Sequence, residues 1–163
     1  MDHTLEARWF YPGSPPDALV DWIRDLGAEL DSVRTDLYLV STDPAMNVKL
    51  REGKVQTKHR LGPSTPITFG DRAQGYQERW VKWSFDLDDE PDLLDDDPTD
   101  LWVPVHKERL QLEMDEDDQE DRLDGLVEED PTEAALELTT VSARGEEAWS
   151  VCIESEGRPE GLP

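Results

Sequence analysis

Cysteine and lysine are scarce in this chain of 163 residues, and long apolar runs are absent. A single cysteine, Cys152, excludes an intrachain disulfide and a zinc cluster held by several thiolates. No segment approaches the roughly 18 apolar residues of a transmembrane helix, and the N-terminus lacks the pattern of a signal peptide. We therefore expect a cytoplasmic protein that does not enter a membrane.

Acidic residues are in large excess over basic ones. The chain has 40 Asp and Glu against 16 Lys and Arg, which gives a formal net charge of -24. Such a charge repels nucleic acid and anionic membrane surfaces, so neither is an expected partner. Hydrophobic residues still make up 36% of the chain, and six of them are Trp. The length and this apolar content predict one folded domain rather than a disordered acidic tail.

Half of the acids lie in two blocks. Residues 86–100 contain nine acids and no base, and residues 113–130 contain eleven acids and one Arg. A solvated surface is the simpler interpretation of such blocks. Calcium binding is the alternative, but neither block has the ordered spacing of an EF-hand loop. With only five lysines in the chain, this acidity is typical of a halophilic source, where salt screens the self-repulsion.

Hydrophobic periodicity predicts one helix and many strands. Leu19, Ile23, Leu26 and Leu30 recur at helical spacing after Ser14, a candidate N-cap, and predict an amphipathic helix over roughly 15–31. Alternation with period two predicts eight strands, near 3–10, 35–41, 46–52, 54–61, 78–86, 102–112, 134–142 and 147–156.

Turn signals complete this secondary-structure prediction. Glu52-Gly53 and Arg144-Gly145 predict hairpin turns, and residues 62–77, rich in Pro and Gly, predict a loop. The fold class is therefore mainly β (α+β), an antiparallel barrel of eight strands, closed or nearly closed. We expect residues 1–157 to form its single domain and 158–163 a flexible tail.

A pair of bases separated by one residue occurs in three of the predicted strands. In each pair the two bases share a strand face, while apolar neighbours take the other face. The pairs are Lys49 and Arg51, Lys58 and Arg60, and Lys107 and Arg109. Exposed sheet faces often carry such bases. Here, however, three such pairs lie on strands whose other face is apolar and can be buried elsewhere. This favours an arrangement in which all three pairs of bases point into one barrel interior.

Carboxylates alternate in the same way on other strands. Glu6 shares a face with Thr4 and Arg8, Glu137 with Thr139, and Glu154 with Glu156. Bases and carboxylates inside one barrel require a wet interior that holds a charged ligand or paired ions. Converging Lys and Arg would bind a polyphosphate. Glu side chains would hold Mg²⁺ or Mn²⁺, which prefer oxygen ligands.

The order of these motifs resembles the CYTH superfamily, the triphosphate tunnel metalloenzymes. Leu5-Glu6-Ala7-Arg8 is similar to the opening E-x-E-x-K strand of that family, with Glu6 on its second Glu and Arg8 on its Lys. The three basic pairs resemble the K-x-R motifs, and Glu154-x-Glu156 resembles the terminal E-x-E. The resemblance spans residues 4 to 156. It implies a tunnel of eight strands and metal-dependent chemistry on a triphosphate.

The resemblance and the strand faces together assign a role to each candidate residue. Phosphates would be held by Arg8, Lys49, Arg51, Lys58, Arg60, Lys107 and Arg109. Catalytic carboxylates would be Glu6, Glu154 and Glu156, and the metal ligands Glu6, Glu137, Glu154 and Glu156. The expected ligand is inorganic triphosphate, thiamine triphosphate or a nucleoside triphosphate.

Two departures from the family pattern leave catalysis open. Thr4 and Thr139 stand where the family has carboxylates. The chain is therefore either a metal-dependent triphosphatase or a non-catalytic module that binds a phosphorylated metabolite or another polyanion. A barrel for an apolar ligand is a third reading, which the charged inner face disfavours. His59 and His106 fall on the opposite face from the bases, and the oligomeric state stays open, a homodimer included.

Overall fold

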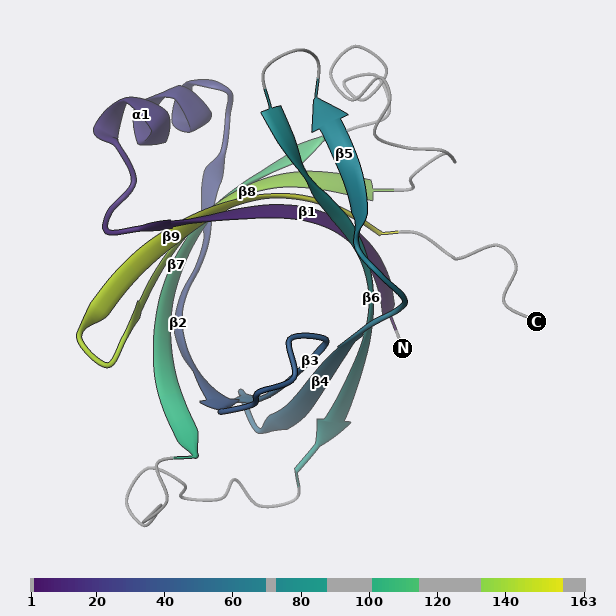
Figure 1. Ribbon diagram of the computed structural model, residues 1–163. Coiled ribbons are helices and arrows are strands. Elements are labelled where there is room, and N and C mark those ends of the chain that lie inside the picture. The colour runs from purple at the N-terminus through teal and green to yellow at the C-terminus, as the bar shows by residue number, and fades with distance from the viewer. Residues whose placement is uncertain (1, 70–72, 88–100, 115–132, 157–163) are drawn as a thin grey trace.

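A computed structural model describes residues 2–69, 73–87, 101–114 and 133–156. The acidic blocks and the predicted tail lie almost wholly outside these ranges. One helix and nine strands follow one another along the described chain (Figure 1). They are β1 (Asp2–Pro12), α1 (Asp17–Asp25), β2 (Glu29–Leu39), β3 (Met46–Arg51), β4 (Lys54–Arg60), β5 (Thr65–Phe69), β6 (Ala73–Asp86), β7 (Trp102–Met114), β8 (Glu133–Ala143) and β9 (Glu146–Glu156).

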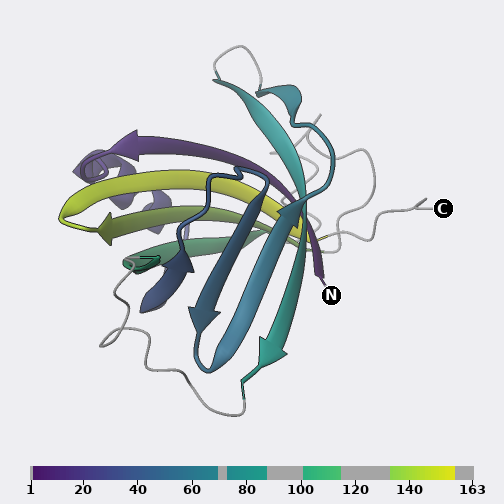
Figure 2. The same cartoon turned by 60° about the horizontal axis from the view of Figure 1, so that its bottom comes forward.

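The strands form a closed antiparallel barrel. Their order is β1-β9-β8-β7-β2-β3-β4-β6-β5, and β1 also pairs with β6, from Asp2 opposite Lys82 to Ala7 opposite Gln77. This last pairing closes a ring of eight strands, seen end-on in Figure 1 and from the side in Figure 2. The predicted fold class is confirmed, with one strand more than expected.

The additional strand, β5, replaces part of the predicted loop over 62–77. It pairs only with β6, with Thr65 opposite Gln77 and Phe69 opposite Ala73. Pro66 is compatible with a strand here because β5 lies at an edge, where no second neighbour needs its missing N–H. The loop prediction was therefore wrong for this segment. Together β5 and the start of β6 form a hairpin that stands away from the barrel (Figure 2).

The helix is shorter than the predicted 15–31. It ends at Asp25 because Gly27 adopts a positive φ of 102°, which favours glycine. The Gly27 N–H donates to the Arg24 carbonyl and the Ala28 N–H donates to the Ile23 carbonyl, a Schellman arrangement that terminates the helix. Ser14 is not the N-cap, since Pro16 takes that position and no side chain caps the helix.

Both predicted hairpin turns are present. Glu52 and Gly53 have φ of 50° and 71°, and Arg144 and Gly145 have φ of 52° and 79°. Two consecutive residues with positive φ form the type I′ turn, whose twist matches that of the flanking strands. These turns fix the registers of β3 with β4 and of β8 with β9.

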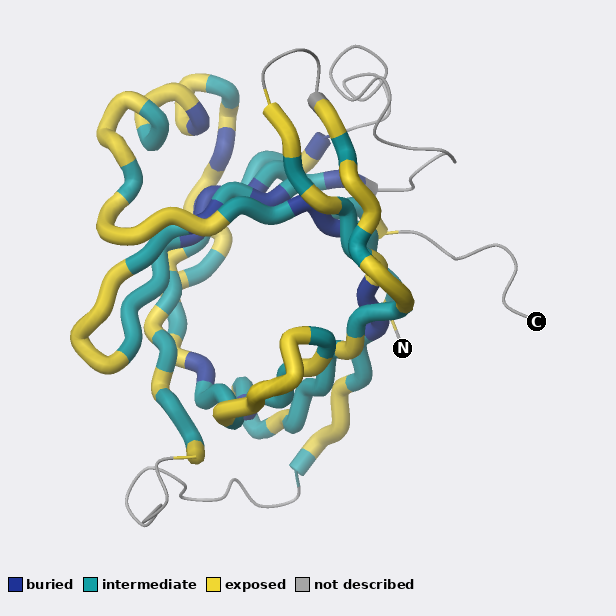
Figure 3. The backbone as a smooth tube through the Cα atoms, viewed as in Figure 1, coloured by how far each residue is buried: buried dark blue, intermediate teal, exposed yellow. Residues whose placement is uncertain are grey.

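The largest apolar cluster lies outside the barrel, not within it. Ile23 of α1 packs with Ala28, Leu110 and Leu138, and the partly buried Leu136 and Val151 pack against this group. Figure 3 shows buried positions on the barrel wall beside α1. The apolar faces of β7, β8 and β9 are thus turned outward under the helix. Their alternate residues, including Lys107 and Glu137, consequently point into the barrel.

Candidate functional site: a charged cavity inside the barrel

A cavity of about 890 Å³ fills the barrel interior and takes side chains from all eight strands of the ring. Among the described residues, its lining contains eight bases and four acids. The bases are Arg8, Arg34, Lys49, Arg51, Lys58, Lys82, Lys107 and Arg109, and the acids are Glu6, Glu78, Glu137 and Glu154. The cavity lining is therefore basic within a chain whose net charge is -24.

Most of the residues singled out in the sequence meet in this cavity. Five of the six paired bases line it, as do Arg8, Glu6, Glu137 and Glu154. Arg60 is not among the lining residues, and its Nη1 donates to Glu78 Oε1 at 2.5 Å. Glu156 is exposed at the end of β9 and also lies outside the lining. Glu156 thus lies apart from the rest of the predicted site, whereas Arg60 borders the cavity through its contact with the lining residue Glu78.

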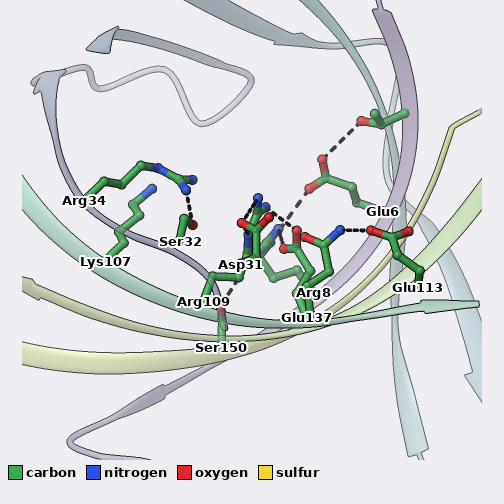
Figure 4. A network of polar contacts seen from close by, with 12 residues as sticks. Glu6, Arg8, Asp31, Ser32, Arg34, Lys107, Arg109, Glu113, Glu137 and Ser150 are labelled. Carbon is green, nitrogen blue, oxygen red and sulfur yellow. Dashed lines mark hydrogen bonds and ion pairs between the residues drawn. The ribbon is translucent and has the colours of Figure 1, made fainter. Parts of the chain in front are cut away.

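The acidic side chains of Glu6 on β1 and Glu137 on β8 are held by neighbouring bases. Lys58 Nζ contacts Glu6 Oε1, and Arg8 Nε lies 3.7 Å from Glu6 Oε2. Glu137 accepts from Arg8 Nη2 at 3.0 Å and from Arg109 Nη1 at 2.5 Å, with their charged ends turned toward one another (Figure 4). Both oxygens of the buried Glu137 carboxylate are therefore occupied by guanidinium groups.

The electrostatics of Glu6 and Glu154 differ, although the two residues lie directly opposite on β1 and β9. Burial disfavours the Glu6 carboxylate, but the charges of Lys58 and Arg8 outweigh this effect and hold the pKa of Glu6 below its usual range. Burial and the charge of Glu6 raise the pKa of Glu154 to about 7. Glu154 therefore shares its site with a carboxylate that keeps its charge.

A second charged group surrounds Asp36, whose side chain is fully buried at 0% exposure. Lys49 Nζ lies 3.2 Å from Asp36 Oδ2, and Arg34 Nε lies 3.6 Å from Asp36 Oδ1. One carboxylate thus serves two bases, which leaves an excess of positive charge on this side of the barrel. That excess is available for an anion entering the cavity.

Lys107 is the base least compensated by a carboxylate. Its Nζ lies 4.5 Å from the centre of the Tyr38 ring and donates to the Tyr38 hydroxyl. Burial and the nearby charge of Lys49 lower the pKa of Lys107 to about 7. Burial and the charge of Asp36 raise the pKa of the Tyr38 hydroxyl to about 12, so the phenol stays neutral. An anion beside Lys107 would restore its charge.

Three ligand atoms of Glu6, Cys152 and Glu154 lie within 4.8 Å of one another and form a group that could hold a metal ion. Cys152 is fully buried at 0% exposure. It stands two residues before Glu154 on β9, so both side chains take the same strand face. Burial raises the pKa of the Cys152 thiol well above its ordinary value.

Several cavity residues were missed by the sequence prediction. Arg34 and Tyr38 alternate along β2, but the overlong predicted helix concealed the start of that strand. Lys82 shares a face of β6 with Glu78 and Trp80, a signal that was present in the sequence and unused. Cys152 has the strand parity of Glu154, so it too could have been assigned to the inner face.

Two histidines, His59 and His106, were expected on the strand face opposite the paired bases. His59 and His106 are exposed, and His106 Nδ1 lies 3.2 Å from the Thr35 hydroxyl.

No helix in the described ranges has the length and apolarity needed to cross a membrane. Neither a scan against protein-family models nor a search of curated proteins finds a match for this chain.

Proposed function

We propose that the barrel cavity binds a small polyanion of the triphosphate class. The observation that carries the proposal is the excess of bases in the lining, eight against four acids. Four acids pair with lining bases from outside the lining, and two of them, Asp2 and Glu52, are exposed, so water screens their charges. Counting the other two, Asp31 and Asp36, leaves eight bases against six acids. Burying such an excess of positive charge is costly unless an anion offsets it.

The chemistry of the bases favours several phosphates over one. Lys49, Arg51, Lys58, Lys107 and Arg109 come from three separate strands and surround the cavity. A guanidinium binds phosphate oxygens in a planar, bidentate manner, and an ammonium acts as a point charge. A linear triphosphate offers enough oxygens to engage several of these groups at once. The resemblance to the CYTH superfamily supports the same ligand class.

Hydrolysis of that ligand is the more demanding part of the proposal. The basic side chains would neutralise the charge that develops as the terminal phosphoryl group passes to water. Glu6 and Glu154 would hold a divalent cation, Mg²⁺ or Mn²⁺ as the sequence predicts, and the cation would supply positive charge against the phosphates. The oxygens of Glu6 and Glu154 suit such a cation, but the sulfur of Cys152 beside them does not suit Mg²⁺.

Binding without catalysis is a second candidate function, and specific observations favour it. Glu137 has both carboxylate oxygens engaged by Arg8 and Arg109. Glu156 is exposed and lies outside the cavity lining. Thr4 and Thr139 contribute hydroxyl groups where the resemblance would place carboxylates. Two of the four predicted metal ligands are thus left for a cation, fewer than a two-metal hydrolase requires.

Calorimetry with tripolyphosphate and with orthophosphate, in buffer containing a chelator, tests the binding proposal. Tripolyphosphate should bind more tightly, and Arg51→Ala should weaken it by about 1.5–3 kcal/mol, the value of hydrogen bonds to charged groups. Lys54→Ala is the matched control, because Lys54 pairs with the exposed Asp86 and lies outside the lining. Equal effects of the two substitutions would refute the proposal.

Release of orthophosphate from a panel of triphosphates then separates the two candidate functions. A hydrolase should release phosphate in the presence of a divalent cation and lose this activity in Glu154→Gln. A binding module should show the calorimetric signal and no release with any cation. The absence of both signals would reject the two candidates together.

A further inference from the structure

The group of Glu6, Cys152 and Glu154 combines two oxygen ligands with one sulfur ligand, a mixture that selects among metals. Mg²⁺ requires near-octahedral oxygen coordination. Thiolate ligands favour softer or borderline cations such as Zn²⁺ and Co²⁺. The two oxygen ligands and one sulfur ligand of this group therefore do not suit Mg²⁺, the cation that the triphosphate chemistry predicts.

The geometry brings all three ligands to one point from two paired strands. Glu6 on β1 lies opposite Glu154 on β9, and the neighbouring Arg8 lies opposite Cys152. The three ligand atoms are within 4.8 Å of one another. Bonds of about 2.0–2.3 Å to a tetrahedral ion require the ligands to close by about 1 Å, which small side-chain rotations supply.

Cys152 is an independent indication that something belongs at this point. It is fully buried, and among the described residues its thiol has no hydrogen-bond partner. It shares a strand face with Ser150 and Glu154, whereas Trp149 and Val151 of the opposite face pack in the apolar cluster under α1, so the thiol does not belong to that cluster. Glu154 likewise has no hydrogen bond or ion pair within the described ranges.

We infer that Glu6, Cys152 and Glu154 form a binding site for a thiophilic divalent cation of the Zn²⁺ or Co²⁺ class. The cation would compete with Lys58 for Glu6 Oε1, which Lys58 Nζ contacts. Displaced from Glu6, the Lys58 ammonium would be free to turn toward an anion in the same cavity. The inference deepens the proposed function by naming its cation, and it can fail without affecting anion binding.

The sole cysteine of the chain makes the test specific. Protein without an affinity tag, stripped of metal and free of phosphate, is titrated with Co²⁺ and followed by absorbance. A near-ultraviolet charge-transfer band from thiolate to cobalt can arise only from Cys152. We expect this band in the unaltered chain, its loss in Cys152→Ser, and its retention in Glu156→Gln, a control on the same strand outside the group.

Competition titrations give a second measure. Cys152→Ser should weaken the binding of Zn²⁺ and Co²⁺ by at least roughly tenfold, because even the loss of a group that only hydrogen-bonds a metal ligand reaches that size. It should leave any Mg²⁺ binding within about twofold. A Co²⁺ spectrum without the charge-transfer band overturns the inference, and this measurement needs no variant. Unchanged Zn²⁺ affinity in both Cys152→Ser and Glu154→Gln overturns it as well. Because no anion is present, neither result depends on tripolyphosphate binding.

Discussion

Replacing Lys107 with methionine should stabilise the protein, although it removes a residue of the proposed binding site. The Lys107 ammonium lies over the Tyr38 ring, close to the charge of Lys49, and among the described residues no carboxylate pairs with it. Methionine has a similar length, is unbranched and carries no charge that burial would penalise. The cavity thus keeps a charged group at the expense of stability, as functional sites often do.

The size and the pH dependence of the effect follow from the pKa of Lys107, which falls from 10.5 to about 7. Each pKa unit corresponds to about 1.4 kcal/mol. Burying the Lys107 charge therefore lowers the free energy of unfolding by up to about 5 kcal/mol below pH 7. Water in the cavity screens the charge, and we expect about 2–4 kcal/mol. Between pH 7 and 10.5 the unfolded chain binds more protons, so this loss shrinks as pH rises and vanishes above 10.5.

Urea unfolding at pH 6, 8 and 10 measures the effect directly. Lys107→Met should exceed the original chain in stability at pH 6, and the difference should decline steadily toward pH 10. Lys54→Met is the control, because Lys54 lies outside the cavity, and it should change little at any pH. A Lys107→Met protein that is less stable at pH 6, or a difference that does not vary with pH, would refute the reasoning.

Three further predictions concern packing, a buried charge and salt. Gly75→Ala should destabilise the fold by about 1–3 kcal/mol in urea melts, because a Cβ at position 75 would meet the Trp9 ring at 2.6 Å; an unchanged melt would contradict this. Asp36→Asn should cost about 3–5 kcal/mol by the same measurement, since it leaves Lys49 and Arg34 without their carboxylate; a neutral result would show that the bases reach water instead. Melting temperature should rise with KCl into the molar range, as the Debye length falls from about 30 Å at 0.01 M to about 3 Å at 1 M; a flat profile would count against a halophilic origin.

The barrel was predictable from the sequence because its strands alternate so regularly. Alternation places Val48 and Leu50 on one face and Lys49 and Arg51 on the other, and a shift of one residue would reverse every side chain. The hairpin turn at Glu52-Gly53 also made the register of β3 with β4 predictable, because a two-residue turn fixes which residues lie opposite one another. Alternation left the barrel either closed or nearly closed, and the pairing of β1 with β6 in the structure shows that it is closed.

The boundaries were less predictable, because single residues decide them. Gly27 ends α1 through its positive φ, and the last helical residue is Asp25. Leu26 and Leu30 nevertheless continue the helical spacing of apolar residues past Asp25. Periodicity therefore outweighed the glycine in the prediction. Pro66 argued for a loop, and only the position of β5 at the edge of the sheet makes a proline acceptable there.

The site was predictable to the extent that strand parity determines which residues face inward. Parity does not determine which partner an inward charge takes, because that depends on pairing between distant strands. Arg60 shares the parity of Lys58, but its contact with Glu78 follows from the neighbouring strand β6. Glu137 was expected as a metal ligand on the basis of a resemblance, and only the packed barrel reveals Arg8 and Arg109 on its two oxygens.

The central claim is that a polyanion binds inside the barrel, and nuclear magnetic resonance tests it most directly. Tripolyphosphate is titrated into isotope-labelled protein in chelating buffer, and amide shifts are followed along β3, β4 and β7. The account predicts saturable shifts at the segments carrying Lys49, Arg51, Lys58 and Lys107, with little change at exposed positions of α1 such as Trp22. Shifts confined to the outer surface, or none at saturating tripolyphosphate, would contradict it.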